Sequence, residues 1–343
     1  MTDRRAFILG VTGSLMAAAR IGRAQQRTES LGMIGILNSW PTSLRPSSRP
    51  SASPRMLLGA AATGDLRDQI EALTARHGKF VEWVSFPDNA PVTRLSEQAR
   101  ALIQSNVATI VAVGTAATIA AAEATTVIPI VMVGVADPVA LGLIQSLPRP
   151  EKNVTGVSLL GPEILEKSLE LLLEAAPSIR RPAVLWNPAN PGAALSLQHL
   201  ERAATVKGLN VVSAPIERAE GLEGVLADLG QLAHDAVILI SDPVFPGKAD
   251  RILQYCSRQR LPTLFSTADW VMKGGLISYE PEASELSRRA AAYVVRILLG
   301  AKPRDLPVEQ PTTFRLTVNA KAAKALGLTM PQSLLVRADE VIE

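Results

Sequence analysis

The sequence is poor in the residues that build metal and disulfide sites, with one cysteine and three histidines among 343 residues. A single cysteine, Cys256, excludes a disulfide within the chain and any cysteine-rich zinc or iron–sulfur site. The histidines, His77, His199 and His234, lie far apart, so we expect neither a metal centre nor a cofactor. No apolar run reaches the roughly 18 residues that a membrane-spanning helix needs.

Common catalytic signatures are also missing. There is no Gly-x-Ser-x-Gly elbow, and no Gly-x-Gly-x-x-Gly follows the first predicted strand. Gly247-Lys248 lacks the upstream glycine of a phosphate-binding loop, because Asp242 stands in its place. We therefore predict no catalytic residues and no enzymatic activity. Aromatic residues make up only 4%, which makes the stacking platforms of sugar sites scarce.

The charge balance argues against a nucleic-acid partner. The chain carries 35 Lys and Arg against 32 Asp and Glu. Four of these basic residues and one acid lie in the first 24 positions, so the remainder is balanced at 31 against 31. A near-neutral chain with scattered basic residues lacks the electrostatic footprint of DNA or RNA binding.

The first 24 residues are typical of an export signal. Arg4-Arg5 is a charged start, residues 6–19 are largely apolar, and Gly22-Arg23-Ala24 offers the small residues of a cleavage site. The order Arg4-Arg5-Ala6-Phe7-Ile8 also resembles a twin-arginine signal, which serves the export of prefolded proteins. Asp3 occupies a position where that motif usually has a small or neutral residue, so the choice between export routes stays open. We predict cleavage after Ala24 and a periplasmic mature protein with no lipid anchor at that end.

Short apolar runs alternate with amphipathic segments through the rest of the chain. The runs are nearly continuous and rich in Val and Ile, a pattern typical of strands buried on both faces of a parallel sheet. The alternation predicts an α/β protein with parallel sheets and right-handed crossovers. The predicted strands are 33–37, 81–86, 109–113, 129–135, 183–186, 211–216, 236–240, 263–265 and 276–279, and the predicted helices include 94–104, 163–175, 195–207 and 249–260.

Small and polar residues lie at or just after the ends of several predicted strands. Open α/β sheets bind ligands at this edge, and the N–H groups at the start of each following helix favour an anion. The alternative is that these residues only cap helices. The candidate ligand-binding residues are Thr115, Ala116, Ala117, Asp137, Asn187, Asn190, Ser241, Asp242, Thr267 and Tyr279.

Four motifs in order carry a resemblance to a known family. They are Asn153-Val154-Thr155-Gly156-Val157-Ser158, Val184-Leu185-Trp186-Asn187-Pro188 with Asn190-Pro191, Gly275-Leu276-Ile277-Ser278-Tyr279, and 306–312 with Ala325-Leu326-Gly327-Leu328. From about Val81 to Glu343 the chain resembles the ABC-transporter substrate-binding family that includes tryptophan- and tyrosine-type binding proteins. The resemblance implies a type I periplasmic-binding-protein fold, with two Rossmann-like lobes, three hinge crossovers and a small ligand in the cleft. It also implies an ABC membrane permease as partner, and we expect a monomer.

The implied fold sets the domain boundaries. We expect lobe one to comprise 31–154 plus 276–308 and lobe two 157–273 plus 312–343, with crossovers near 154–157, 273–276 and 307–313. The chain departs from the family pattern over 38–79. Pro41–Pro54 is rich in proline and serine and predicts a loop, and a helix is expected over Asp65–Arg76.

The candidate residues suggest how a small amino acid or related carboxylate would bind. Thr115, with the N–H groups of Ala116 and Ala117, suits a carboxylate, and Asp242 on the opposite lobe suits an ammonium group. We expect the Asp242 carboxylate to be solvated, so that replacing it affects affinity but hardly folding. Besides an importer's receptor, two functions stay open: a ligand-sensing partner of a membrane signalling protein, and an exported α/β enzyme acting on a small carboxylate.

Overall fold

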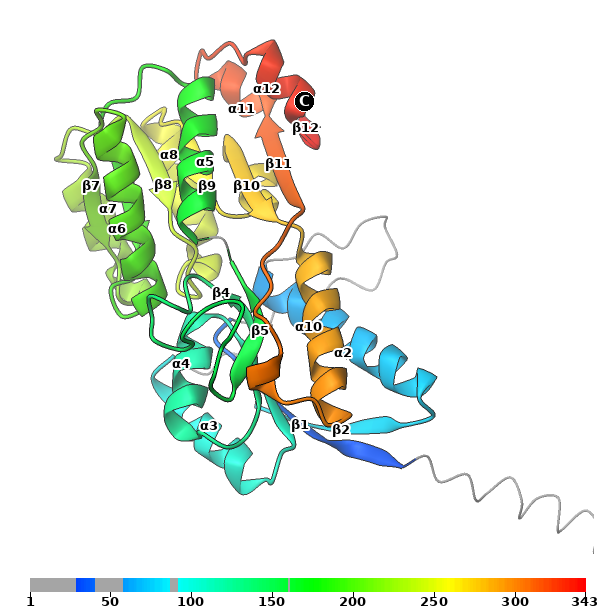
Figure 1. Cartoon of the computed structure of the whole chain (residues 1–343). Helices are drawn as coiled ribbons and strands as arrows, with labels where there is room; N and C mark the ends of the chain where they lie inside the picture. The colour runs from blue at the N-terminus through cyan, green and yellow to red at the C-terminus, as the bar shows by residue number, and fades with distance from the viewer. Residues whose placement is uncertain (1–28, 41–57, 87–91, 160) are drawn as a thin grey trace, which may run out of the picture.

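The computed structural model describes residues 29–40, 58–86, 92–159 and 161–343. The chain forms two α/β lobes, one below the other in Figure 1, and each is built around one sheet. Among the described residues, no helix is both long and apolar enough to cross a membrane. The predicted export signal and the predicted loop Pro41–Pro54 lie outside the described residues.

Lobe one holds a five-stranded sheet in the order β2-β1-β3-β4-β5, with every neighbouring pair parallel. Its centre is apolar because β3 has the sequence TIVAV and is buried along its whole length. The strands are β1 (Ser30–Asn38), β2 (Phe80–Ser85), β3 (Thr109–Val113), β4 (Ile130–Val135) and β5 (Val154–Ser158). The helices are α2 (Leu58–Arg76), α3 (Leu95–Gln104), α4 (Thr115–Ala124) and α10 (Ala283–Leu298), with the short turns η1 (Val92–Arg94) and η4 (Pro303–Asp305).

Lobe two holds a seven-stranded sheet in the order β12-β11-β10-β9-β8-β6-β7, parallel except for the antiparallel pair β10–β11. The strands are β6 (Pro182–Trp186), β7 (Val212–Pro215), β8 (Ala236–Leu239), β9 (Thr263–Phe265), β10 (Ile277–Pro281), β11 (Phe314–Asn319) and β12 (Glu340–Ile342). The helices are α5 (Gly161–Ala175), α6 (Pro191–Val206), α7 (Leu222–Leu229), α8 (Ala249–Arg258), α9 (Ala268–Met272), α11 (Ala320–Ala325) and α12 (Gln332–Arg337), with η2 (Ala219–Gly221) and η3 (Pro246–Lys248).

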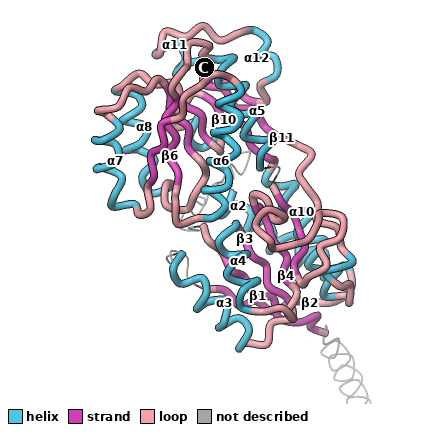
Figure 2. Tube along the Cα trace, turned by 60° about the vertical axis from the view of Figure 1, so that its left-hand side comes forward, coloured by secondary structure: helices cyan, strands magenta, loops and turns pink. Residues whose placement is uncertain are grey.

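Helices cover both faces of each sheet, which is why central strands such as β3, β4 and β8 are almost wholly apolar. In lobe one, α3 and α4 pack on one face and α2 and α10 on the other. In lobe two, α5 and α6 cover one face, and α7 and α8 cover the other. Figure 2 shows the strands enclosed between helices in each lobe. This layering confirms the predicted α/β fold with two Rossmann-like lobes.

All nine predicted strands are present, and the helix predicted over Asp65–Arg76 is the second part of α2. Three strands were missed, namely β5, β11 and β12. The first contains Gly156, which lowers strand propensity. The second, FRLTVN, mixes polar and apolar residues, and the third has only three residues at the edge of its sheet. None of them has the continuous apolar character on which the prediction depended.

The chain passes between the lobes three times, but two passages come later than expected. The strand β5 pairs with β4 in lobe one, so the first passage follows Ser158 and not 154–157. The strand β10 pairs with β9 and β11, so residues 277–281 belong to lobe two and the second passage follows Pro281. The third passage, ahead of β11, falls near the expected 307–313.

Candidate ligand-binding site

The carboxyl edges of the two sheets face each other, and the lobes touch there. A β-carbon placed on Gly192 at the start of α6 would lie 2.7 Å from the Oγ1 atom of Thr115, the first residue of α4. Gly161 at the start of α5 likewise approaches lobe one. A β-carbon placed on Gly161 would lie 2.8 Å from the carbonyl oxygen of Ala136. The residues that follow the strands of one lobe are thereby brought close to those of the other.

Asp242 is the centre of a polar cluster at this edge of lobe two. Its Oδ1 atom accepts hydrogen bonds from the Asn187 side-chain amide at 2.8 Å and from the backbone N–H of Val244 at 3.0 Å. Its Oδ2 atom accepts from the Asn190 side-chain amide at 2.7 Å. The loops after β6 and β8 are thus joined by one carboxylate, which brings three of the predicted site residues together.

The environment of Asp242 differs from the predicted one. The side chain is only 2% exposed, so the expectation of a solvated carboxylate is wrong. Burial raises the pKa of Asp242, while the hydrogen bonds from Asn187 and Asn190 oppose that rise. A buried carboxylate that accepts three hydrogen bonds also stabilises the loops that donate them.

The two asparagines make both local backbone contacts and contacts to Asp242. Asn190 caps α6, since its Oδ1 atom accepts the N–H of Gly192 at 3.0 Å, while its amide nitrogen binds Asp242. Asn187 accepts the N–H of Ala189 at 2.9 Å and donates to Asp242. The helix-capping alternative therefore holds for Asn190, and the same side chain also fixes the position of the Asp242 carboxylate.

Thr115 lies where the prediction placed it, at the start of α4 in lobe one. It follows Gly114, whose φ of 88° is in the left-handed region that glycine tolerates. The Thr115 hydroxyl accepts the N–H of Ala136 at 3.4 Å, and the side chain is 8% exposed. Ala116 and Ala117 form the rest of the first turn, and the side chain of Ala117 is buried in the core of lobe one.

The remaining predicted residues, apart from Ser241, lie outside the Asp242 cluster. Asp137 accepts the N–H groups of Val139 and Ala140 at 3.1 and 3.0 Å, which is the turn-capping alternative. Ser241 is half-buried beside Asp242, and Thr267 is buried ahead of α9. Tyr279 stacks on Phe314 with ring centroids 5.4 Å apart and packs on the α5 side of the sheet, so it is a packing residue in this structure.

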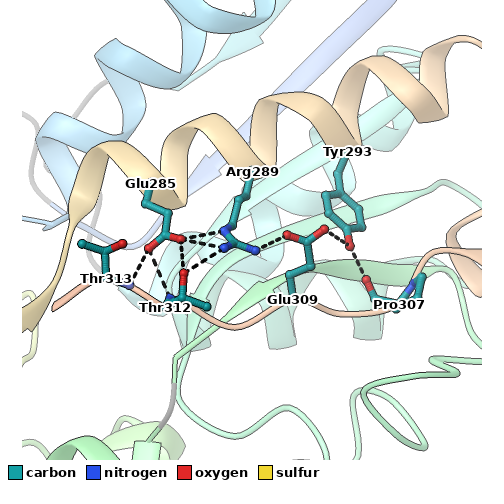
Figure 3. Close-up of polar contacts among 7 residues, drawn as sticks. All are labelled: Glu285, Arg289, Tyr293, Pro307, Glu309, Thr312 and Thr313. Atoms are coloured by element: carbon teal, nitrogen blue, oxygen red, sulfur yellow. Dashed lines mark hydrogen bonds and ion pairs between the residues drawn. The ribbon is translucent and has the colours of Figure 1, made fainter.

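A second polar cluster, which the sequence did not reveal, lies where the chain returns to lobe two. Glu285 in the first turn of α10 accepts the N–H groups of Thr312 and Thr313 at 3.2 and 3.0 Å. It also accepts the Thr312 hydroxyl at 2.8 Å and the Arg289 guanidinium at 2.6 Å. Figure 3 shows this row of side chains along α10 facing the returning segment.

The same network continues to Glu309. Arg289 binds the Glu309 carboxylate at 2.5 Å, and the Tyr293 hydroxyl donates to Glu309 at 3.0 Å and also contacts the Pro307 carbonyl (Figure 3). The Glu309 backbone pairs with β5, through the Gly156 carbonyl and the Ser158 N–H, both at 3.0 Å. The returning segment is therefore fixed to lobe one on two sides.

The second and third passages are also bonded to each other. The N–H of Glu282 donates to the carbonyl of Thr313 at 3.0 Å. Burial alone would raise the pKa of Glu285, but hydrogen bonds from Thr312 and Arg289 lower that pKa to about 2. The ionised form of Glu285 thus joins α10 to the segment that enters β11 at neutral pH. The only sequence signal was Glu309 within the 306–312 motif, and nothing in the sequence indicated Glu285.

Two lobes are joined by three chain segments and carry polar groups on their facing edges. This arrangement defines a two-lobed ligand-binding protein of the periplasmic-binding-protein type. The model of the ABC transporter substrate binding protein family matches residues 61–342, and the chain belongs to this family. That is a family of binding proteins and not of enzymes. The chain is accordingly assigned, at the level of the family, to the substrate-binding proteins of ABC transporters.

Individual proteins are similar to this chain in sequence or in fold. The chain is 26% identical over 220 residues to a tyrosine-binding protein of Clostridioides difficile, an alignment that covers 64% of this chain and 63% of that protein. Its fold is similar to an ABC domain of Streptococcus pneumonia in complex with L-Trp, with a TM-score of 0.75, 22% identity, and coverage of 90% and 100%. A conserved domain protein of Vibrio cholerae gives a TM-score of 0.78 at 23% identity, with coverage of 91% and 100%.

Proposed function

We propose that this protein is an extracytoplasmic receptor that captures a free amino acid, or a closely related small carboxylate, and delivers it to an ABC membrane permease. The observation that carries this proposal is the pairing of two chemistries across the lobes. The start of α4 at Thr115 offers N–H groups, and the buried carboxylate of Asp242 with its two asparagines lies on the other lobe. The tyrosine-binding relative and the L-Trp complex support an amino acid as the ligand class.

The ligand's carboxylate fits the start of α4. The backbone N–H groups of the first helical turn and the helix dipole both favour an anion there. Thr115 adds a hydroxyl at the same place and touches Gly192 of the other lobe. Its position at the contact between the lobes makes it sensitive to whether they are open or closed.

The ammonium group fits the carboxylate side of lobe two. Asp242 can accept a further charge-assisted hydrogen bond, because its Oδ2 atom receives only the Asn190 amide among the described contacts. Lobe closure around the ligand would exclude water from these contacts. The ligand stabilises the closed form only by binding it more tightly than the open form, which gives the permease a distinct shape to recognise.

Export is the second part of the proposal. Cleavage after Ala24 would release a mature protein that begins at Gln25. N-terminal sequencing of the protein from a periplasmic extract tests this directly. A protein that still begins at Met1, or that stays in the cytoplasmic fraction, would contradict export.

Binding is tested by a thermal-shift screen of the common amino acids, followed by titration calorimetry of those that raise the melting temperature. We expect at least one amino acid, with L-tyrosine and L-tryptophan as the first probes, to bind in a 1:1 complex. The variant Thr115→Val, which keeps the shape of the side chain but loses its hydroxyl, should weaken binding by about tenfold, the equivalent of roughly 1.4 kcal/mol. Thr205→Val on the exposed side of α6 is the matched control and should leave affinity unchanged.

A further inference from the structure

Glu280 is a second carboxylate at the edge of lobe two that faces lobe one. It is the next-to-last residue of β10, and its Oε1 atom accepts the N–H of Ala268 at 2.7 Å. Because side chains alternate along a strand, Glu280 lies on the opposite sheet face from Tyr279. It therefore points to the face that α9 covers, at the end of the sheet where ligands bind in open α/β folds.

The order of the strands places Glu280 in line with the Asp242 cluster. The strands β6, β8, β9 and β10 are neighbours in the sheet. At or just beyond their carboxyl ends lie, in the same order, Asn187, Asp242, Thr267 and Glu280. Neighbouring strands are about 4.8 Å apart, so the ends of β8 and β10 are separated by about 10 Å. That separation is within the length of one amino-acid ligand.

Among the described residues, hydroxyl groups without a hydrogen-bond partner lie on the same sheet face as this carboxylate or next to the residue that binds it. Antiparallel pairing sets Arg315 opposite Glu280 and Thr317 opposite Ser278. Within the described part of the chain, the buried hydroxyls of Thr267, Ser278 and Thr317 have no hydrogen-bond partner. Thr267 is 4% exposed and directly precedes Ala268, which binds Glu280. Buried polar groups of this kind are normally satisfied, so the group of hydroxyls points to a polar occupant beside Glu280.

The electrostatic surroundings favour a cation. Burial raises the pKa of Glu280 to about 7, and the nearby carboxylates of Asp269 and Glu282 raise it as well. Arg315 lowers it, but the Arg315 guanidinium is already 3.5 Å from Glu340. Asp242 accepts three hydrogen bonds, whereas one is found for Glu280 among the described residues. Ionised Glu280 thus has unused acceptor capacity and too little positive charge nearby.

We propose that Glu280 forms a second anionic subsite of the ligand site and accepts a cationic group of the bound ligand, an ammonium or a guanidinium. This inference rests on the proposed function and adds a residue that determines specificity. The cation can be the α-ammonium of an amino acid or the side-chain cation of a basic one. In either case, ligand binding requires the ionised form of Glu280.

The test is titration calorimetry at pH 6, 7 and 8 on wild type, Glu280→Gln and the control Glu282→Gln, which removes one charge two residues away. The probes are L-tyrosine with its desamino analogue 3-(4-hydroxyphenyl)propionate, and L-arginine with its neutral isostere L-citrulline. With a pKa of about 7, the ionised fraction of Glu280 rises about tenfold from pH 6 to pH 8, and affinity for the cationic probe should rise with it. We expect Glu280→Gln to abolish that slope. Glu282→Gln should keep the slope but displace it to lower pH, because it removes one of the carboxylates that raise the pKa of Glu280.

The two probe pairs identify the source of the cation. A preference for L-tyrosine over its desamino analogue that depends on Glu280 assigns the α-ammonium, and a preference for L-arginine over L-citrulline assigns a side-chain cation. If the slope is the same in wild type and Glu280→Gln, or if neither preference depends on Glu280, the subsite is overturned while the receptor function stands. If wild type binds no amino acid at all, the proposed function fails and this inference fails with it.

Discussion

Glu285 accepts the backbone N–H of Thr313 over 3.0 Å, which ties the first turn of α10 in lobe one to the segment that enters β11 in lobe two. The Thr313 carbonyl in turn accepts the N–H of Glu282 over 3.0 Å. Two of the three passages between the lobes are therefore held to each other and to α10. Rotation of the lobes is expected on the lobe-two side of these contacts, at Pro281–Glu282 and at Thr313–Phe314.

The network at Glu285 predicts an acid-sensitive stability. The folded pKa of about 2 lies below the ordinary value of 4.5, so ionised Glu285 stabilises the fold above pH 4.5 and that stability is lost as the pH falls towards 2. Glu285→Gln should be less stable at pH 7 and should lose less stability on acidification. Urea denaturation of both proteins at pH 7, 4.5 and 3 measures this, and parallel losses in the two proteins would contradict it.

Replacing Asp242 should impair both folding and binding. In Asp242→Asn an NH₂ group would face one of the two asparagine amides that now donate to the carboxylate. A buried donor left without an acceptor costs about 1–3 kcal/mol, and the ligand also loses a charged partner. We expect a lower urea midpoint and an affinity reduced by at least tenfold. Unchanged stability with lost affinity would instead show that the asparagines do not depend on Asp242.

Closure of the lobes should depend on the absence of a side chain at Gly192. In Gly192→Ala the new β-carbon would lie 2.7 Å from Thr115 Oγ1, which real contacts do not allow. The lobes would have to stay further apart, so ligand affinity should fall by about tenfold or more while the stability of each lobe is kept. Small-angle scattering with and without ligand measures closure.

The matched control for that experiment is Gly224→Ala in α7. It makes the same chemical change within a helix, and nothing lies within 4 Å of its would-be β-carbon. It should bind and close like wild type. Equal ligand affinity in the two glycine variants would show that Thr115 and Gly192 need not touch for binding.

In the ligand-free protein, Glu280 should make the free energy of unfolding depend on pH in the opposite direction from Glu285. Its folded pKa of about 7 exceeds the ordinary 4.5, so its contribution to stability is present below pH 4.5 and is lost as the pH rises through 7. Glu280→Gln should therefore melt above wild type at pH 8 and closer to it at pH 5. For a domain of about 200 residues, each 1 kcal/mol shifts the melting temperature by roughly 2–4 °C. Differential scanning calorimetry decides this, and an identical gap at both pH values would refute it.

The central strands were readable from the sequence because continuous Val and Ile runs are typical of buried parallel strands. The Asn187–Asp242 contact joins residues 55 apart in the chain. Strand order brings them together, so the sequence could nominate them separately but could not pair them. It also could not show that Asp242 is buried, because burial depends on both asparagine loops folding over it.

Glu280 and Glu285 were missed for a different reason. Acidic residues near the start of an amphipathic helix are typical of solvent-exposed positions, and the segment 280–285 has three of them. The structure buries Glu285 because the returning segment at 309–313 packs along α10, a contact between distant parts of the chain. The position of the second crossover was misjudged in the same region, since only pairing with β11 shows that β10 belongs to lobe two.

The most direct test is native mass spectrometry of the protein, purified without denaturation and then incubated with an equimolar mixture of amino acids. Capture of a free amino acid between the lobes predicts a single added mass, equal to one amino acid, that is retained by wild type and reduced in both Thr115→Val and Gly192→Ala. A protein that shows no added mass, or that retains the added mass equally in both variants, would contradict binding at this site.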